Sequence, residues 1–159
     1  MTTNASQRNI EKAMMDYYSS HEQELLGRKQ IYHAWLTHMI EDLRSLSKSL
    51  EAAGFEALPE VNIEDSIYEE NAKFQSVYSK LGFECLQENP SLRELADTDQ
   101  SFDEIHTQKI TDFYVNFSTC YEKPSLDEFI FSIYNYGDEK LTSKVMACIE
   151  KKLQSQKLL

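Results

Sequence analysis

One repeating interval runs through residues 14–39: side chains recur at alternating spacings of four and three residues, the a/d pattern of a helix packed along a seam. The seam positions are Met14, Tyr18, His21, Leu25, Arg28, Tyr32, Trp35 and Met39. A second interval of four leads to Leu43, as in a stutter, and the pattern resumes through Leu46 and Leu50. We therefore predict one helix over residues 6–53, about 45 residues and roughly 65 Å long.

The apolar face of this helix widens in its second half, where Leu36 and Ile40 join Trp35 and Leu43. A wider face contacts more neighbours, so the pattern predicts that the second half is the more deeply buried part. Gly27 is a possible kink, but the seam keeps its phase across it. A continuous helix is therefore favoured.

The rest of the chain also favours helices, because four glycines and three prolines supply too little turn chemistry for an all-β fold. Apolar spacing predicts further helices over residues 64–82, 91–97, 101–122, 125–136 and 138–156. A length of 159 residues suits one domain. We expect a single all-α domain, residues 1–159, in which the long helix packs against four or five shorter ones.

Several helix ends have recognisable signals. Gly54 predicts the C-cap of the long helix, and Gly82 followed by Phe83 predicts the end of the second helix. The stretches NPSLREL (89–95) and KPSLDEF (123–129) each place a proline, a capping serine and a glutamate three residues after the serine.

A further start is predicted by Ser101 and Glu104, which have the spacing of a capping box.

The cysteines predict neither a disulfide framework nor a zinc site. Cys85, Cys120 and Cys148 are odd in number, far apart and without a CxxC or CxxH spacing. We expect free thiols in a reducing cytosol. The first residues lack an apolar signal core, and no apolar run is long enough to span a membrane. The expected location is the cytoplasm, or a cell into which a secretion system delivers the protein.

The histidines raise the question of a metal or acid–base site. His33 and His38 are about 140° apart on a helix and cannot share one ion, and His21 is far from both. Neither HExxH nor Glu-x-x-His occurs. The spacing favours a register role for His21, and a surface pair of His38 with Asp42. His106 lies in no recognised pattern. We expect no metal ligand and no cofactor.

Motifs for nucleophilic catalysis are also absent, since the chain has no Gly-x-Ser-x-Gly, P-loop or Gly-x-Gly-x-x-Gly. Free cysteines on apolar helix faces are usually core residues. We therefore predict no catalytic residue and a protein that is not an enzyme.

The net charge is −11, and most of the excess acid lies in residues 59–105. A field of this sign opposes binding to nucleic acid and to anionic lipid. The acidic segment is either a solvated face or a surface that recognises a basic protein. The candidate acidic residues are Glu60, Glu64, Asp65, Glu69, Glu70, Glu94, Asp97, Asp99, Asp103 and Glu104.

Two aromatic residues, Phe131 and Tyr136, fall off the main apolar stripe of their predicted helix. If exposed together, they would form an aromatic patch of the kind enriched at interfaces. The other aromatic residues of this part of the chain follow helical spacing and are predicted to be core.

These features favour a non-enzymatic interaction protein that binds a basic protein partner, as small acidic inhibitors, immunity proteins and secretion chaperones do. One alternative is a homodimeric scaffold protein in which the seam from Met14 to Leu50 pairs with a second copy. The other is a helical-bundle metal protein or enzyme, which requires at least three side chains to converge in one cavity, drawn from His21, His33, His38, His106 and nearby carboxylates.

Overall fold

The structure, a computed structural model, describes residues 2–59, 65–98, 104–118, 122–134 and 139–159, with side chains from residue 9 onward except those of residues 65, 97 and 98. Seven helices and no strand occur in these ranges, so the predicted all-α bundle is confirmed. The helices are α1 (Thr2–Ser20), α2 (Glu22–Ala52), α3 (Asp65–Glu88), α4 (Pro90–Thr98), α5 (Glu104–Asn116), α6 (Leu126–Tyr134) and α7 (Glu139–Ser155).

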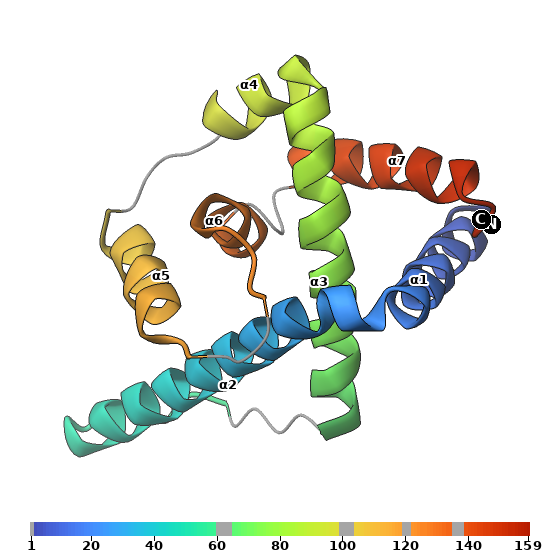
Figure 1. Cartoon of the computed structure of the whole chain (residues 1–159). Coiled ribbons are helices and arrows are strands. Elements are labelled where there is room, and N and C mark those ends of the chain that lie inside the picture. The colour runs from blue at the N-terminus through green and yellow to red at the C-terminus, as the bar shows by residue number, and fades with distance from the viewer. Residues whose placement is uncertain (1, 60–64, 99–103, 119–121, 135–138) are drawn as a thin grey trace.

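The central helix is α3, which runs through the middle of the molecule and contacts α1, α2, α4, α6 and α7 (Figure 1). Its buried face carries Val77, Tyr78, Leu81 and Cys85, each 1% exposed or less. α5 joins the assembly mainly through α6. The bundle is thus organised around α3 and not around the helices that precede it in the chain.

The predicted single helix over residues 6–53 is wrong, because the chain bends at His21 between α1 and α2. His21 has φ −127° and ψ 30°, outside the helical region. Just before it, the hydroxyls of Ser19 and Ser20 donate to the carbonyls of Met15 and Asp16 at 3.1 and 2.9 Å. Such bonds from serine to the preceding turn bend helices.

The bend lets α1 pack against α3 and α7 while α2 crosses α3 in another direction (Figure 1). Gly27 lies buried inside α2, and the helix runs through it without a break.

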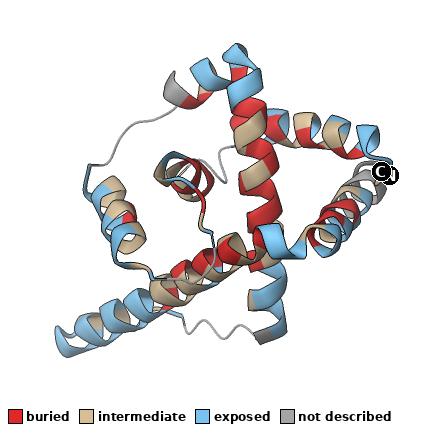
Figure 2. Cartoon of the chain, viewed as in Figure 1, coloured by how far each residue is buried: buried red, intermediate tan, exposed pale blue. Residues whose placement is uncertain are grey.

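The second half of α2 is the less buried half, contrary to the prediction. The buried residues of α2 end at Ile40. Beyond it, Leu43 and Leu46 are 42% and 50% exposed. Figure 2 shows these last turns extending past the bundle into solvent. The wide apolar face therefore marks where α3, α5 and α6 meet α2, and the seam continues beyond that point uncovered.

The second helix does not end at Gly82, since α3 continues to Glu88. Gly82 is instead a close-packing position. A Cβ atom there would lie 3.0 Å from Cγ1 of Val145 and 3.3 Å from the ring of Phe131. The glycine allows α6 and α7 to approach the backbone of α3, a requirement that only the packed structure reveals.

Two apolar clusters form the core. The first gathers buried residues of α1, α3, α4 and α7, together with Leu25 of α2 and Phe131 of α6. The second contains Ile31, Tyr32 and Trp35 of α2, Ala72 of α3, Ile110 of α5 and Phe129 of α6. α6 therefore lies between the clusters and sends one phenylalanine into each.

The helix-start signals are confirmed in part. Ser125 caps α6, because its Oγ accepts a hydrogen bond from the N–H of Glu128 at 3.2 Å. For α4 the cap is Asn89 and not Ser91: Oδ1 of Asn89 accepts from the N–H of Ser91 at 3.1 Å. Pro90 then takes the first helical position, where its missing N–H costs nothing.

The predicted helix 101–122 is too long, because α5 ends at Asn116 and residues 117 and 118 are not helical. Ser101 and the capping box it would form lie outside the described residues.

Candidate functional site

The acidic residues predicted to meet a partner are distributed over three helices. Glu69 and Glu70 lie near the start of α3, Glu94 lies in α4, and Glu104 begins α5; all four are exposed. α3 has 24 residues and is roughly 36 Å long. The two glutamates at its start and the one in α4 are therefore at opposite ends of the central helix.

The remaining predicted acids contribute no described side chain. Asp65 and Asp97 lie in α3 and α4, but their side chains are not described. Glu60, Glu64, Asp99 and Asp103 lie outside the described residues.

Glu69 has an internal partner. Its Oε1 lies 3.0 Å from Nζ of Lys29 on α2. The hydrogen bond and positive charge of Lys29 lower the pKa of the Glu69 carboxyl. The pair joins α2 to α3, so Glu69 has a role in the fold besides any role in binding.

The aromatic patch predicted from Phe131 and Tyr136 is not supported. The patch required Phe131 and Tyr136 to be exposed together, and Phe131 is only 4% exposed. Its ring stacks on Tyr78, with centroids 5.7 Å apart, and lies 6.2 Å from the ring of Phe83. Phe131 lies off the main apolar stripe of α6 because α6 packs against an apolar cluster on each of two sides. Tyr136 lies outside the described residues.

The histidines lie apart, each beside an aromatic ring. The contacts are His21 with Tyr17, His33 with Tyr68, His38 with Trp35 and Phe113, and His106 with Tyr134. The predicted pair of His38 with Asp42 is confirmed, at 3.5 Å. Within the described ranges, no group of three or more His, Cys, Asp or Glu residues could hold a metal ion.

A buried polar cluster between the two apolar clusters was missed by the sequence analysis. Arg28 of α2 donates to both carboxylate oxygens of Glu128 of α6, at 2.7 and 3.2 Å. Oε2 of Glu128 also accepts from the hydroxyl of Ser79 of α3, at 3.3 Å. Burial alone would lower the pKa of Arg28, but the hydrogen bond and charge of Glu128 raise it.

Tyr32 of α2 and Ser132 of α6 complete this cluster, with their hydroxyl oxygens 2.5 Å apart. Burial raises the pKa of Tyr32 above its ordinary value, so its phenol is a poor acid at neutral pH. Arg28 and Ser79 hold the carboxylate of Glu128. The cluster therefore joins α2, α3 and α6 through hydrogen bonds between buried side chains.

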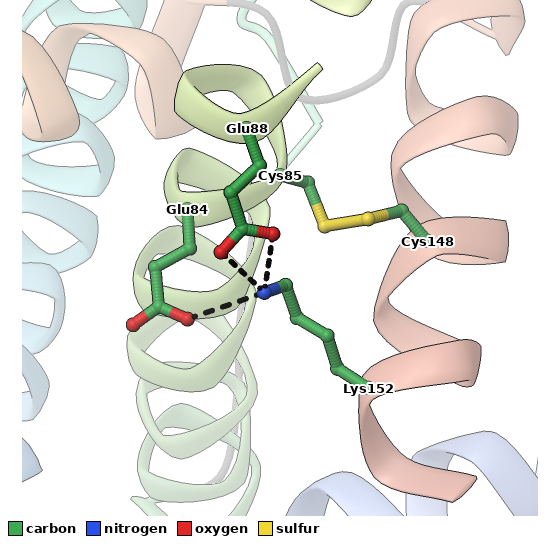
Figure 3. The surroundings of a disulfide bond; sticks show 5 residues. All are labelled: Glu84, Cys85, Glu88, Cys148 and Lys152. Atoms are coloured by element: carbon green, nitrogen blue, oxygen red, sulfur yellow. Dashed lines mark hydrogen bonds and ion pairs between the residues drawn. A yellow bond between two sulfur atoms is a disulfide. The ribbon is translucent and has the colours of Figure 1, made fainter. Parts of the chain in front are cut away.

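Cys85 and Cys148 form a disulfide between α3 and α7, with Cα atoms 6.3 Å apart (Figure 3). The prediction of free thiols is wrong for these two residues; Cys120 lies outside the described residues. Next to the disulfide, Lys152 binds Glu88 at 2.8 Å and Glu84 at 3.7 Å. Cys85 and Cys148 are 63 residues apart, a spacing that matches no local motif, so the disulfide could be predicted only once α3 was known to pack against α7.

The strongest surface feature is the end of α2, here named the α2 tip and defined by Leu43, Leu46, Leu50 and Phe55. Leu43, Leu46 and Phe55 are 42%, 50% and 67% exposed. A small protein rarely leaves several large apolar side chains together in water unless they bind something.

The backbone of the α2 tip is well ordered by hydrogen bonds. The N–H of Phe55 donates to the carbonyl of Leu50 at 2.9 Å, and that of Gly54 to Glu51 at 3.0 Å. With φ +89° at Gly54, this is a Schellman motif, and the predicted glycine cap is confirmed. It places Phe55 next to Leu50, so the apolar surface continues around the end of the helix.

A groove of about 300 Å³ flanks the α2 tip, between α2 and residues 57–59. The N–H of Leu58 donates to Oγ of Ser47 at 3.0 Å and holds the returning segment against the helix. Arg44, Lys48 and Glu51 border the groove. The tip thus combines exposed apolar side chains, a shallow groove and a charged rim, as interfaces do.

Comparison with known proteins adds no function: no protein-family model, curated protein or solved structure matches the chain. Among the described helices, none has the length and apolar composition needed to cross a membrane.

Proposed function

We propose that this is a non-enzymatic interaction protein whose contact surface is the α2 tip and whose partner is a basic protein. The observation that supports this proposal is the exposure of Leu43 and Leu46, 42% and 50%, on helical turns that extend beyond the bundle (Figure 2). Leucines in such a position bury apolar surface when a partner binds, which is the main favourable term in association.

The charge of the chain favours a basic partner over a second copy. At a net charge of −11, two copies repel each other, whereas a cationic protein is attracted over long range. The exposed Glu70, Glu94 and Glu104 lie on different helices, so they contribute to the field around the molecule and not to one contact face. Inhibitors, immunity proteins and secretion chaperones are the classes of protein that fit this description.

The test compares two variants of equal charge. Leu43→Glu/Leu46→Glu alters the α2 tip, and Gln23→Glu/Ser143→Glu adds the same charge at exposed positions near the starts of α2 and α7. Each protein is immobilised and exposed to lysate of the source cell at low and moderate salt. We expect the wild type and the control to retain one basic protein, which salt releases and which the tip variant does not bind.

The captured protein is then purified and its Kd measured with all three proteins. A loss of at least tenfold in affinity for the tip variant alone supports the proposal, because two buried leucines contribute several kcal/mol. Equal affinity for the tip variant and the wild type would exclude the α2 tip as the contact surface.

A second candidate function, the homodimeric scaffold, has one observation in its favour. Met39, Leu43, Leu46 and Leu50 keep the a/d spacing, and the tip leaves part of this seam uncovered. Light scattering separates the candidates. A mass twice the chain's 18.5 kDa that returns to the monomer value in Leu43→Glu/Leu46→Glu would make a second copy the occupant of the tip.

The compartment is part of the proposal. The predicted cytoplasmic location rested on the lack of an apolar signal core and of a membrane-spanning run, and on free thiols. The Cys85–Cys148 disulfide removes the last of these grounds and favours an oxidising compartment. Alkylation of free thiols in intact cells, before lysis, shows whether Cys85 and Cys148 are reduced or joined by a disulfide in the cell.

A further inference from the structure

A pocket of about 320 Å³ lies among α2, α3 and α6, next to the buried polar cluster. Its walls include Tyr32 and Trp35 from α2, Ala72, Phe74 and Gln75 from α3, and Ser132 from α6. Sites between the helices of a bundle are frequent locations for small-molecule ligands, and this volume is at the lower end of their usual range.

The lining specifies the chemistry of an occupant. Tyr32, Trp35 and Phe74 supply aromatic surface, and none of the described residues that line the pocket is charged. An ion would therefore lose its hydration there without receiving a counter-charge. A flat, uncharged molecule would instead exchange water for contact with aromatic rings.

One polar atom in the wall lacks a partner. Oε1 of Gln75 is buried and accepts no hydrogen bond from the described part of the chain. The two hydroxyls in the wall, those of Tyr32 and Ser132, do have a partner, since they form a hydrogen bond with each other at 2.5 Å. A buried acceptor without a donor is costly, so a ligand that donates a hydrogen bond to Gln75 gains affinity there.

The volume limits the size of the ligand. An apolar cavity of about 150 Å³ in a protein core binds benzene. The present pocket is about twice as large and suits two fused rings.

We propose that this pocket binds a small, uncharged, bicyclic aromatic molecule that donates one hydrogen bond to Gln75, a ligand of the indole class. The α2 tip lies outside the pocket, so this inference does not depend on the proposed interaction with a basic protein.

The chain offers a direct probe, because Trp35 lines the pocket and is the only tryptophan in the sequence. 5-Nitroindole is uncharged, donates one N–H and quenches tryptophan emission. 1-Methyl-5-nitroindole is its matched control without the donor. We expect both compounds to quench Trp35 saturably, with 5-nitroindole binding about tenfold more tightly, and calorimetry to give the same Kd values.

Two variants locate the site. Gln75→Met keeps the length of the side chain but removes the acceptor, so the tenfold preference for the N–H compound should disappear. Ala72→Phe fills the pocket and should abolish quenching by both compounds, with circular dichroism confirming that the variant is folded.

The inference is overturned if 5-nitroindole gives no saturable quenching up to its solubility limit, or if Gln75→Met retains the preference. Equal quenching in folded Ala72→Phe would also overturn it, because the compound would then bind elsewhere. Gln75 is only partly buried as a residue, so its substitution leaves a folded protein for the decisive comparison even if Ala72→Phe does not fold.

Discussion

Arg28 on α2 and Glu128 on α6 are 100 residues apart in sequence and form a two-point ion pair in the interior, with Nε of Arg28 2.7 Å from Oε2 of Glu128. The side chains are only 15% and 7% exposed. Ser79 adds a third hydrogen bond from α3. One carboxylate therefore joins three helices at the boundary between the two apolar clusters.

Removal of one partner should be costly. Glu128→Gln keeps the shape of the side chain but leaves the Arg28 guanidinium without its counter-charge, and we expect the free energy of unfolding to fall by about 3 kcal/mol. Urea unfolding followed by circular dichroism measures the change.

The double variant Arg28→Met/Glu128→Leu replaces the whole pair by apolar side chains and should be within about 1 kcal/mol of the wild type. Ser79 remains satisfied there, because its single O–H can donate to the carbonyl of Ser76, 3.1 Å away, in place of Glu128. If Arg28→Met and Glu128→Leu each cost under 1 kcal/mol alone and their effects add in the double variant, the pair contributes nothing specific to the fold.

The disulfide closes a loop of 63 residues between α3 and α7. Cys148→Ser should lower the free energy of unfolding by about 3–4 kcal/mol, because the unfolded chain regains the conformational freedom that the bond removes. The thermal midpoint should fall by about 10 °C.

The wild type in reductant should match Cys148→Ser without it, and reductant should leave Cys148→Ser unchanged. Cys120→Ser serves as the control that retains the disulfide and the response to reductant. The unfolded wild type is then alkylated without reductant. If three thiols react, and not Cys120 alone, the disulfide is absent.

Gly82 tests the close packing of α3 against α7. Gly82→Ala gains about 1 kcal/mol of helix propensity, but its methyl group would lie 3.0 Å from Cγ1 of Val145. We expect a net loss of about 1–2 kcal/mol in the free energy of unfolding, because packed interiors resist added volume.

Val145→Ala removes the opposing methyl groups and opens space for the new one. Gly82→Ala/Val145→Ala should therefore cost clearly less than the sum of the single substitutions, as measured by a urea double-mutant cycle. Additive costs, or a stabilised Gly82→Ala protein, would mean that α7 does not approach α3 so closely.

Local signals in the sequence predicted local structure. The helical class, the cap at Ser125, the glycine at Gly54 and the pair of His38 with Asp42 each depend on residues within a few positions of one another. The same kind of local signal predicted a helix end at Gly82, which lies inside α3. A glycine that permits close packing and a glycine that ends a helix look the same until the partner helix is known.

Relationships between distant residues could not be predicted. Glu128 follows Ser125 with the spacing of a capping box, yet its carboxylate turns inward to Arg28. The pairing of Cys85 with Cys148 depends on the position of α7 beside α3. The α2 tip has a seam as apolar as the buried part of the helix, and only the positions of the other helices leave it uncovered.

Tyr32 gives the stability of the fold a dependence on alkaline pH. Burial raises its pKa above the ordinary value of about 10, so between these two values the unfolded chain ionises first and binds fewer protons than the folded chain. The stability that Tyr32 contributes through this difference in pKa is fully present below pH 10 and is lost as the pH rises toward the pKa of Tyr32 in the folded protein. The free energy of unfolding should fall by up to about 1.4 kcal/mol per pH unit from this one residue.

Tyr32→Phe removes that part of the slope. Urea unfolding of both proteins from pH 8 to pH 11 separates two effects of the hydroxyl. The difference between the proteins at pH 8 reports the hydrogen bond to Ser132, and the decrease of that difference above pH 10 reports ionisation. Parallel curves over the whole range would mean that the phenol ionises as readily in the folded protein as in the unfolded chain, which a side chain 3% exposed and bonded to Ser132 should not do.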